Sequence, residues 1–252
     1  MQKPLTILKL CSATNLERRA LACLRQARTL QLRGHRVLFA CRPGTPLEER
    51  ARSYNLQVFT DMVFPAAFPR KQLWQECRLM ARRIDIEIVE VIHTHGSPES
   101  WVASVGARLA ARRPAVIRTE HDRIPPGQGV FGQLLHQGLI DHLVVPLDHL
   151  YRQLKALPDF NPRQASLLYN GVDLKRFNPS VDGRKIRAGF KIPEEAPLAL
   201  LAARMDDEKG QQVFLKALAE VRKALPAARG LWACSEEGAD SGNIFLALAE
   251  QR

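Results

Sequence analysis

The chain has 252 residues, of which 46% are hydrophobic and 25% are charged, a composition typical of a folded globular protein. Its formal net charge is +11, and residues 1–60 alone hold 11 Lys and Arg against 3 Asp and Glu. No zinc-finger spacing, RNP-like aromatic pattern or basic-region heptad accompanies this charge, so we do not expect nucleic-acid binding. No apolar run reaches about 18 residues, which excludes a predicted membrane-spanning helix from this sequence.

The N-terminus and the cysteines indicate the compartment. Residues 1–10 lack the basic start, long apolar stretch and cleavage site of a secretory signal, so we expect a cytoplasmic protein. The five cysteines are widely spaced and form no CxxC pair. Cys11 and Cys41 end apolar runs that read as strands, where a thiol packs as a small hydrophobe. We therefore expect structural packing rather than a redox or metal role.

Segments with strand and helix patterns alternate along the first two thirds of the chain. The expected strands are Leu5–Cys11, Val37–Cys41, Leu56–Phe59, Ile86–Ile92, Ala115–Thr119, His142–Pro146 and Ser166–Tyr169. The expected helices are Glu17–Arg33, Pro46–Tyr54, Arg70–Arg83, Pro98–Arg112 and Asp148–Leu157, and Gly132–Ile140 continues the series. This alternation predicts an α/β fold, a doubly wound parallel sheet with helices on both faces.

The alternation stops near Asn170–Pro193, which is rich in turn formers, and then resumes. A strand at Leu198–Ala203, a helix at Gly210–Leu225, a strand at Gly230–Cys234 and a helix at Ser241–Glu250 are expected. The sequence therefore predicts two Rossmann-like domains, the second incomplete. Their expected ranges are an N-terminal domain of residues 1–175, a linker of residues 176–195 and a partial domain of residues 196–252.

Polar clusters fall where strands give way to helices, the place at which open parallel sheets bind ligands. His93–Ser97 follow the fourth expected strand, and Arg118–Asp122 end the fifth. In the second domain, Arg204 and Lys209 flank a strand-to-helix turn, and we expect them to bind a diphosphate.

A metal site is the alternative interpretation of the histidines. His93 and His95 are two residues apart and share one face of a strand end, and with His121 they would offer three imidazole ligands to zinc. No further close-spaced ligand supports this alternative in the sequence.

Four motifs carry a family resemblance. The segments IHTHG (92–96), RTEHD (118–122), YNGVDLKRF (169–177) and ARMDDEKG (203–210) resemble family 4 glycosyltransferases of the GT-B fold. They are similar to the bacterial branch that builds lipopolysaccharide and other envelope glycans, and the resemblance runs through nearly the whole chain. It implies transfer of a sugar, with retention, from a nucleoside-diphosphate sugar to a glycan or lipid-linked acceptor.

The resemblance also implies roles for single residues. The donor diphosphate would bind Arg204 and Lys209, and His121, close to the transferred sugar, would be the catalytic hydrogen-bonding group. The acceptor-side residues would be Thr14, Asn15, His95, Gly96, Ser97, Glu120 and Asn170. Such enzymes use no metal or other cofactor, because Arg, Lys and helix N-termini offset the charge of the leaving diphosphate.

The sequence departs from the family pattern at three places. A Gly-Gly pair is usual in the loop after the first strand, but no glycine precedes Gly34, and residues 14–17 read Thr-Asn-Leu-Glu. The glycine-rich turn of the second domain reads Cys-Ser-Glu-Glu-Gly at residues 234–238. The paired glutamates that hold the donor sugar are expected beyond residue 252. A non-catalytic remnant acting as a binding or scaffold protein is therefore the alternative function.

Two further interpretations remain. A nucleotide-sugar epimerase shares the architecture, although the NGVD and ARMDDEKG motifs argue against it. The basic N-terminal quarter and the expected helix Arg70–Arg83, with Trp74, would suit the anionic inner face of the cytoplasmic membrane. The competing interpretation of that helix is a solvated surface helix that packs Leu73, Cys77 and Met80 on the core.

Overall fold

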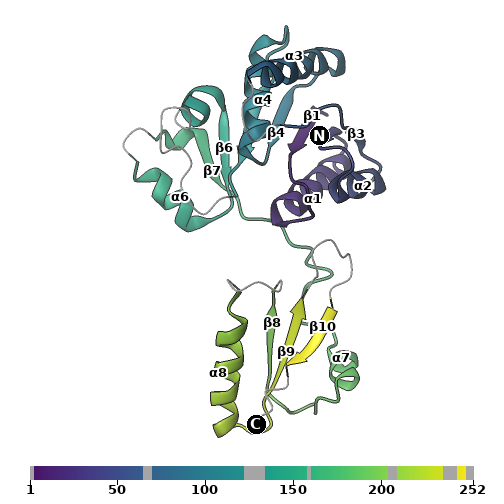
Figure 1. The fold of residues 1–252 in the computed structure, drawn as a ribbon, viewed down its shortest axis with the longest axis vertical. Coiled ribbons are helices and arrows are strands. Elements are labelled where there is room, and N and C mark those ends of the chain that lie inside the picture. Colours follow the sequence, from purple (N-terminus) through teal and green to yellow (C-terminus); the bar gives the residue numbers. More distant parts are fainter. Residues whose placement is uncertain are drawn as a thin grey trace. The chain divides into compact units, whose positions relative to one another are not determined.

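The computed structural model describes residues 3–64, 70–121, 134–157, 160–203, 209–234 and 243–247. The chain divides into two compact units, residues 1–171 and residues 172–252 (Figure 1). The whole of the expected linker, residues 176–195, belongs to the second unit, where α7 (Arg184–Gly189) forms and Ile192 packs in the core.

The first unit contains a seven-stranded sheet in which every neighbouring pair is parallel, in the order β3-β2-β1-β4-β5-β6-β7. The strands are β1 (Thr6–Cys11), β2 (Arg36–Cys41), β3 (Gln57–Phe59), β4 (Val91–Thr94), β5 (Ala115–Thr119), β6 (His142–Val145) and β7 (Ala165–Leu167). The strand order reverses between β1 and β4. This reversal is the switch point at which doubly wound sheets bind ligands.

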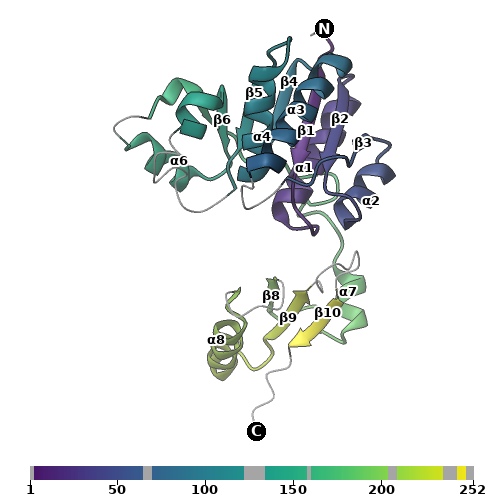
Figure 2. The same cartoon turned by 45° about the horizontal axis from the view of Figure 1, so that its top comes forward.

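Helices cover both faces of this sheet (Figures 1 and 2). They are α1 (Arg18–Leu32), α2 (Pro46–Ser53), α3 (Arg70–Glu87), α4 (Ser97–Leu109), the π-helix η1 (Leu134–Leu139), α6 (Asp148–Lys155) and the 3₁₀ helix η2 (Pro162–Gln164). Leu10 and its neighbours pack against α3 and α4 on one face, while Phe39 and Cys41 pack against α1 and α2 on the other. α3 and α4 approach closely at Gly106, where a Cβ would lie 2.6 Å from Met80 Cγ. The doubly wound prediction is confirmed.

The boundary between α3 and β4 differs from the prediction, whereas the two strand-end cysteines agree with it. The predicted strand Ile86–Ile92 is wrong in its first half, because α3 continues to Glu87 and β4 begins only at Val91. The alternating apolar residues there suggested a strand, but Ile84 packs one helical turn after Met80 on the core. The expected burial of Cys11 and Cys41 is confirmed, since both are fully buried.

The second unit contains a three-stranded sheet in the order β10-β9-β8 and the helix α8 (Gln211–Ala224). β8 (Leu198–Ala202) and β9 (Arg229–Cys234) are parallel, whereas β10 (Asn243–Ala247) runs antiparallel to β9. The predicted helix at Ser241–Glu250 is therefore wrong. A short apolar run does not distinguish helix from strand, and pairing with β9 satisfies its backbone groups.

No helix in the described part of the chain is long and apolar enough to cross a membrane.

Candidate functional site

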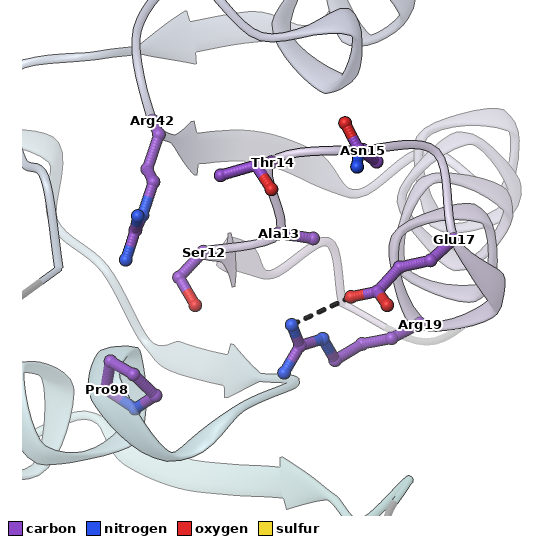
Figure 3. A pocket seen from close by; sticks show the side chains of 8 residues that line it. All are labelled: Ser12, Ala13, Thr14, Asn15, Glu17, Arg19, Arg42 and Pro98. Carbon is purple, nitrogen blue, oxygen red and sulfur yellow. Dashed lines mark hydrogen bonds and ion pairs between the residues drawn. The ribbon is translucent and has the colours of Figure 1, made fainter. Parts of the chain in front are cut away.

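A pocket lies at the carboxyl ends of β1 and β2, beside the first turn of α4 (Figure 3). Its volume is about 290 Å³, and its lining residues are Ser12, Ala13, Thr14, Asn15, Glu17, Arg19, Arg42 and Pro98. The loops that follow neighbouring parallel strands meet at this edge because the strands run in the same direction. The pocket therefore lies at the switch point of the sheet.

Charged side chains flank the pocket on two sides (Figure 3). Arg42 extends from the loop after β2, and its Nη2 donates to the carbonyl oxygen of Phe64 at 2.8 Å. On the other side of Ser12, Arg19 forms an ion pair of 2.8 Å with Glu17. The lining thus holds two guanidinium groups and one carboxylate, a balance that favours an anionic ligand.

A buried carboxylate adjoins the pocket in the first turn of α4. Glu99 is fully buried, and its Oε1 accepts a hydrogen bond of 3.2 Å from the backbone N–H of Ser12. A Cβ on Gly96 would lie 2.7 Å from Arg19 Nη1 and 2.8 Å from Glu99 Oε1. Only glycine at position 96 therefore lets the guanidinium and the carboxylate come this close to the strand end.

Lys9, in the middle of β1, is fully buried and donates three hydrogen bonds. The acceptors are Gln26 Oε1 at 2.7 Å, His93 Nδ1 at 2.8 Å and His95 Nε2 at 2.8 Å. Because Lys9 is paired with His93 in the register of β1 and β4, its ammonium faces the histidines across the switch point. An ammonium has three hydrogens, so all its donors are satisfied.

The two histidines extend this network toward the edge of the sheet. His93 Nε2 lies 2.7 Å from Thr119 Oγ1, and His95 Nδ1 lies 3.0 Å from His121 Nε2. The His95 ring stacks on both neighbours, with centroid distances of 4.7 Å to His93 and 5.2 Å to His121. A continuous chain of hydrogen bonds therefore connects Lys9 to His121, which follows β5 and is 8% exposed.

Burial shifts the protonation of this network. Burial lowers the pKa of Lys9 from 10.5 to about 8. Burial, followed by the positive charge of Lys9, lowers the pKa of both His93 and His95 well below the ordinary value of 6.5. At neutral pH the Lys9 ammonium therefore lies beside the neutral imidazoles of His93 and His95.

These neutral histidines predict acid destabilisation of the first unit. When the pH falls from 7.5 to 5.5, the unfolded chain takes up protons at His93 and His95 and the folded chain does not. The free energy of unfolding should then fall by roughly 1.4 kcal/mol for each histidine. Urea unfolding at the two pH values measures this loss. In the His93→Gln variant the loss should be smaller by one histidine's share, and an unchanged loss would contradict the assignment.

The geometry of the histidines bears on the zinc alternative. Both ring nitrogens of His93 and His95 have hydrogen-bonding partners, and the ammonium of Lys9 lies among the rings. A cation at this point repels a second cation. Among the described residues, no group of three or more His, Cys, Asp or Glu is arranged to hold a metal ion.

A buried ion pair ends β5 beside the histidines. Arg118 Nη2 lies 2.8 Å from Glu120 Oε2, and both side chains are only 2% exposed. The same Nη2 donates to Ser97 Oγ at 3.1 Å, which connects β5 to the first turn of α4. Glu120 therefore forms part of the buried support of this edge.

The structure brings together most of the predicted site residues. Thr14 and Asn15 line the pocket, Gly96 and Ser97 begin α4, and His95 contacts His121. Asn170 is exposed after β7, whose carboxyl end lies at the same edge of the sheet. Lys209 belongs to the second unit and precedes α8. Arg204 and Asp122 lie outside the described residues.

Sequence reasoning missed Lys9, Arg19, Arg42 and Glu99. A signal was present for Lys9, because a single charge stands in the apolar run of a central strand. The other three carried no distinguishing pattern, since charged residues at the ends of helices and strands are usually solvated.

Comparisons with known proteins agree with this geometry. The family model for Glycosyltransferase Family 4 matches residues 22–176. A D-inositol 3-phosphate glycosyltransferase of Nocardioides sp. is 31% identical over 124 residues, which cover 49% of this chain and 27% of that protein. The corresponding protein of Acidothermus cellulolyticus is 24% identical over 216 residues, which cover 80% of this chain and 44% of that protein.

Solved structures share the fold at lower identity. A glycosyltransferase from Rickettsia africae gives a TM-score of 0.73 at 17% identity, over 88% of this chain and 59% of that chain. Anabaena HepE, solved in complex with UDP and glucose, gives a TM-score of 0.64 at 17% identity, over 89% and 59%. The chain spans less than half the length of the two D-inositol 3-phosphate glycosyltransferases that it matches. Because the family model covers more than half of this chain, including the histidine network, the chain belongs to glycosyltransferase family 4.

Proposed function

We propose that this chain takes part in the transfer of a sugar from a nucleoside-diphosphate sugar, with UDP as the nucleotide, to an acceptor hydroxyl. The transfer retains the anomeric configuration, and the acceptor is a glycan or lipid-linked molecule of the bacterial envelope, reached from the cytoplasm. The observation that carries the proposal is the position of the pocket and of His121, which share the ligand-binding edge of a sheet in a family 4 chain. HepE bound to UDP and glucose supports the choice of nucleotide.

The acceptor is assigned to the pocket of the first unit. Hydroxyl groups of Ser12 and Thr14 and the amide of Asn15 line it, and these groups suit the hydroxyls of a sugar. Arg42 adds a charge for an anionic substituent. His121 then serves as a hydrogen-bonding group toward the transferred sugar, which enters at the edge of the same sheet.

The donor diphosphate is assigned to the second unit, at Lys209 and Arg204. Gly210 caps α8 with a φ of +75°, a left-handed conformation that favours glycine, and makes no side-chain cap. The N-terminus of α8 therefore presents backbone N–H groups and a positive dipole beside the Lys209 ammonium. This arrangement supports a reaction in which cationic side chains and helix N-termini offset the diphosphate charge without a metal.

Titration calorimetry of the full chain with UDP, GDP and ADP and their sugars tests the proposal. We expect UDP to bind, and we expect Lys209→Ala to weaken its affinity about 10- to 100-fold, because a charged hydrogen bond contributes roughly 1.5–3 kcal/mol. Lys216→Ala removes an exposed lysine from the middle of α8 and should leave the affinity unchanged. Absence of binding to every nucleotide would favour the alternative function, a non-catalytic binding protein.

We further propose that α3 contacts an anionic membrane surface. Its outward face carries Lys71, Trp74, Arg78 and Arg82, all exposed, and the Trp74 side chain is 50% exposed. The inward residues Leu73, Cys77 and Met80 pack on the core, as the competing interpretation required. One face of α3 therefore packs on the core, and the opposite face is available to a membrane surface. Basic residues around an exposed tryptophan are typical of helices that lie at a lipid interface.

Sedimentation with vesicles that contain phosphatidylserine measures this interaction. Replacing Arg78 and Arg82 by alanine should lower the partition coefficient about 30-fold, since each basic residue contributes roughly 1 kcal/mol near such a surface. High salt should also lower the partition coefficient of the wild-type chain, because it screens the attraction between the basic residues and the vesicle surface. A variant with Arg152→Ala and Lys155→Ala in α6 loses the same charge from another helix and should bind normally. Absence of binding at every salt concentration would reject the proposal.

A further inference from the structure

The position of Lys9 is costly for the fold. β1 is buried on both faces, and its other residues from Ile7 to Cys11 are apolar. Moving an ammonium into such surroundings costs free energy, and an aliphatic side chain at position 9 would avoid that cost. Two of the three hydrogen-bond acceptors of Lys9 are His93 and His95, and His95 is hydrogen-bonded to His121 at the edge of the sheet. The buried charge therefore acts on the histidines.

The hydrogens of this network can be assigned from the contacts. The Lys9 ammonium has donors and no acceptor, so His93 Nδ1 and His95 Nε2 must both accept. Each neutral ring then carries its one hydrogen on the other nitrogen. His93 Nε2–H donates to Thr119 Oγ1 at 2.7 Å, and His95 Nδ1–H donates to His121 Nε2 at 3.0 Å.

The same rule extends to the last ring. His121 Nε2 accepts from His95, so the hydrogen of neutral His121 stands on Nδ1. A cationic His121 would place an N–H on Nε2 against the N–H of His95, two donors 3.0 Å apart. We propose that Lys9 is a positioning residue that fixes, through His95, which nitrogen of His121 carries the hydrogen.

The consequence for the reaction rests on the proposed function. With Nε2 occupied by His95, His121 presents Nδ1–H and acts toward a sugar hydroxyl as a hydrogen-bond donor rather than as a base. Lys9 touches no substrate in this scheme. It acts only by setting the direction of the hydrogen bonds, through one intervening ring.

Nitrogen-15 NMR of the histidine rings tests the assignment directly, because the ring nitrogen shifts distinguish the two tautomers. The full chain is labelled at its seven histidines, and the signals of His93, His95 and His121 are assigned by single replacements with glutamine. We expect the Nε2–H form of His93 and the Nδ1–H forms of His95 and His121 at pH 7. In Lys9→Met, His121 should lose its single tautomer and show a substantial Nε2–H fraction.

Thr119→Val is the matched control. It removes the acceptor at the end of the His93 branch, which leads away from His121, and should leave the His121 tautomer unchanged. A wild-type His121 with its hydrogen on Nε2 would overturn the proposal, even if Lys9→Met failed to fold. An unchanged His121 in a folded Lys9→Met variant would overturn it too. The measurement needs no sugar donor, so failure of the proposed transfer would not affect it.

Discussion

Replacing Glu120 by glutamine is expected to destabilise the first unit by about 3–5 kcal/mol. The substitution keeps the shape of the side chain but leaves the guanidinium of Arg118, which is 2% exposed, without a carboxylate. Nε and Nη1 of Arg118 have no hydrogen-bond partner among the described residues, and Nη2 is the nitrogen that contacts Glu120 and Ser97. Urea unfolding in a Trp232→Phe background measures the loss, because the remaining tryptophans, Trp74 and Trp101, belong to the first unit.

An exposed ion pair provides the control for this loss. Asp148 and Arg152 lie 2.7 Å apart in α6, nearly the same distance as the 2.8 Å between Glu120 and Arg118. The side chain of Arg152, however, is 79% exposed. Asp148→Asn should therefore cost at most about 1 kcal/mol. Adding Arg118→Met to Glu120→Gln should recover most of the lost stability, since no unpaired charge then remains buried. Equal losses for Glu120→Gln and Asp148→Asn would show that burial does not set the strength of the pair.

The fold of the first unit could be predicted because apolar strand segments alternate along the sequence with segments of helical periodicity. Leu8 and Leu10 face α3 and α4, whereas Phe39 and Cys41 face α1 and α2, so the central strands read as continuous apolar runs. The sheet edge that carries the site followed from the same pattern, since parallel strands bring their carboxyl ends together. The errors arose where an apolar run was short, as at β10, or where apolar residues continued a helix, as at Ile86 in α3.

The internal chemistry of the site could not be predicted in the same way. Lys9 and His93 are 84 residues apart, and their contact depends on β1 and β4 being neighbours in a defined register. A motif names residues that are close in sequence and carries no information about that register. His93 and His95 suggested metal ligands for this reason, whereas the group between them is an ammonium from another strand.

The loop after β1, where the family usually has a glycine pair, places side chains at the pocket. The loop after β1 carries the side chains of residues 14–17 where the family usually has glycines, and Glu17 forms an ion pair with Arg19 of α1 on one side of the pocket. Side chains in this loop restrict the approach of a ligand to the backbone. On the proposed function, side chains such as Arg42 would recognise the acceptor in this pocket, and Arg42→Ala is the substitution that tests this role.

Lys9→Met is expected to change how stability depends on pH. The pKa of Lys9 is lowered by burial from 10.5 to about 8 in the folded chain. Below pH 8 both states hold the proton, and the folded state bears the full cost of the buried charge. Between pH 8 and 10.5 the folded chain has lost the proton and the unfolded chain still binds it, so stability rises with pH. The difference in unfolding free energy, wild type minus Lys9→Met, should therefore increase by about 3 kcal/mol over this range.

This comparison isolates Lys9 because the other titrating groups are common to both proteins. Among them, Cys23 and Cys11 act on the charge of Lys9, and the pKa of Cys11 is raised well above its ordinary value by its hydrogen bond with Cys23 and by burial. Unfolding in urea at pH 7.5, 9 and 10.5, with the Trp232→Phe background, gives the required free energies. A difference that stays constant with pH would mean that Lys9 keeps its ordinary pKa in the folded chain. A difference that falls would mean that the hydrogen bonds to Gln26 and the histidines stabilise the ammonium by more than burial costs it.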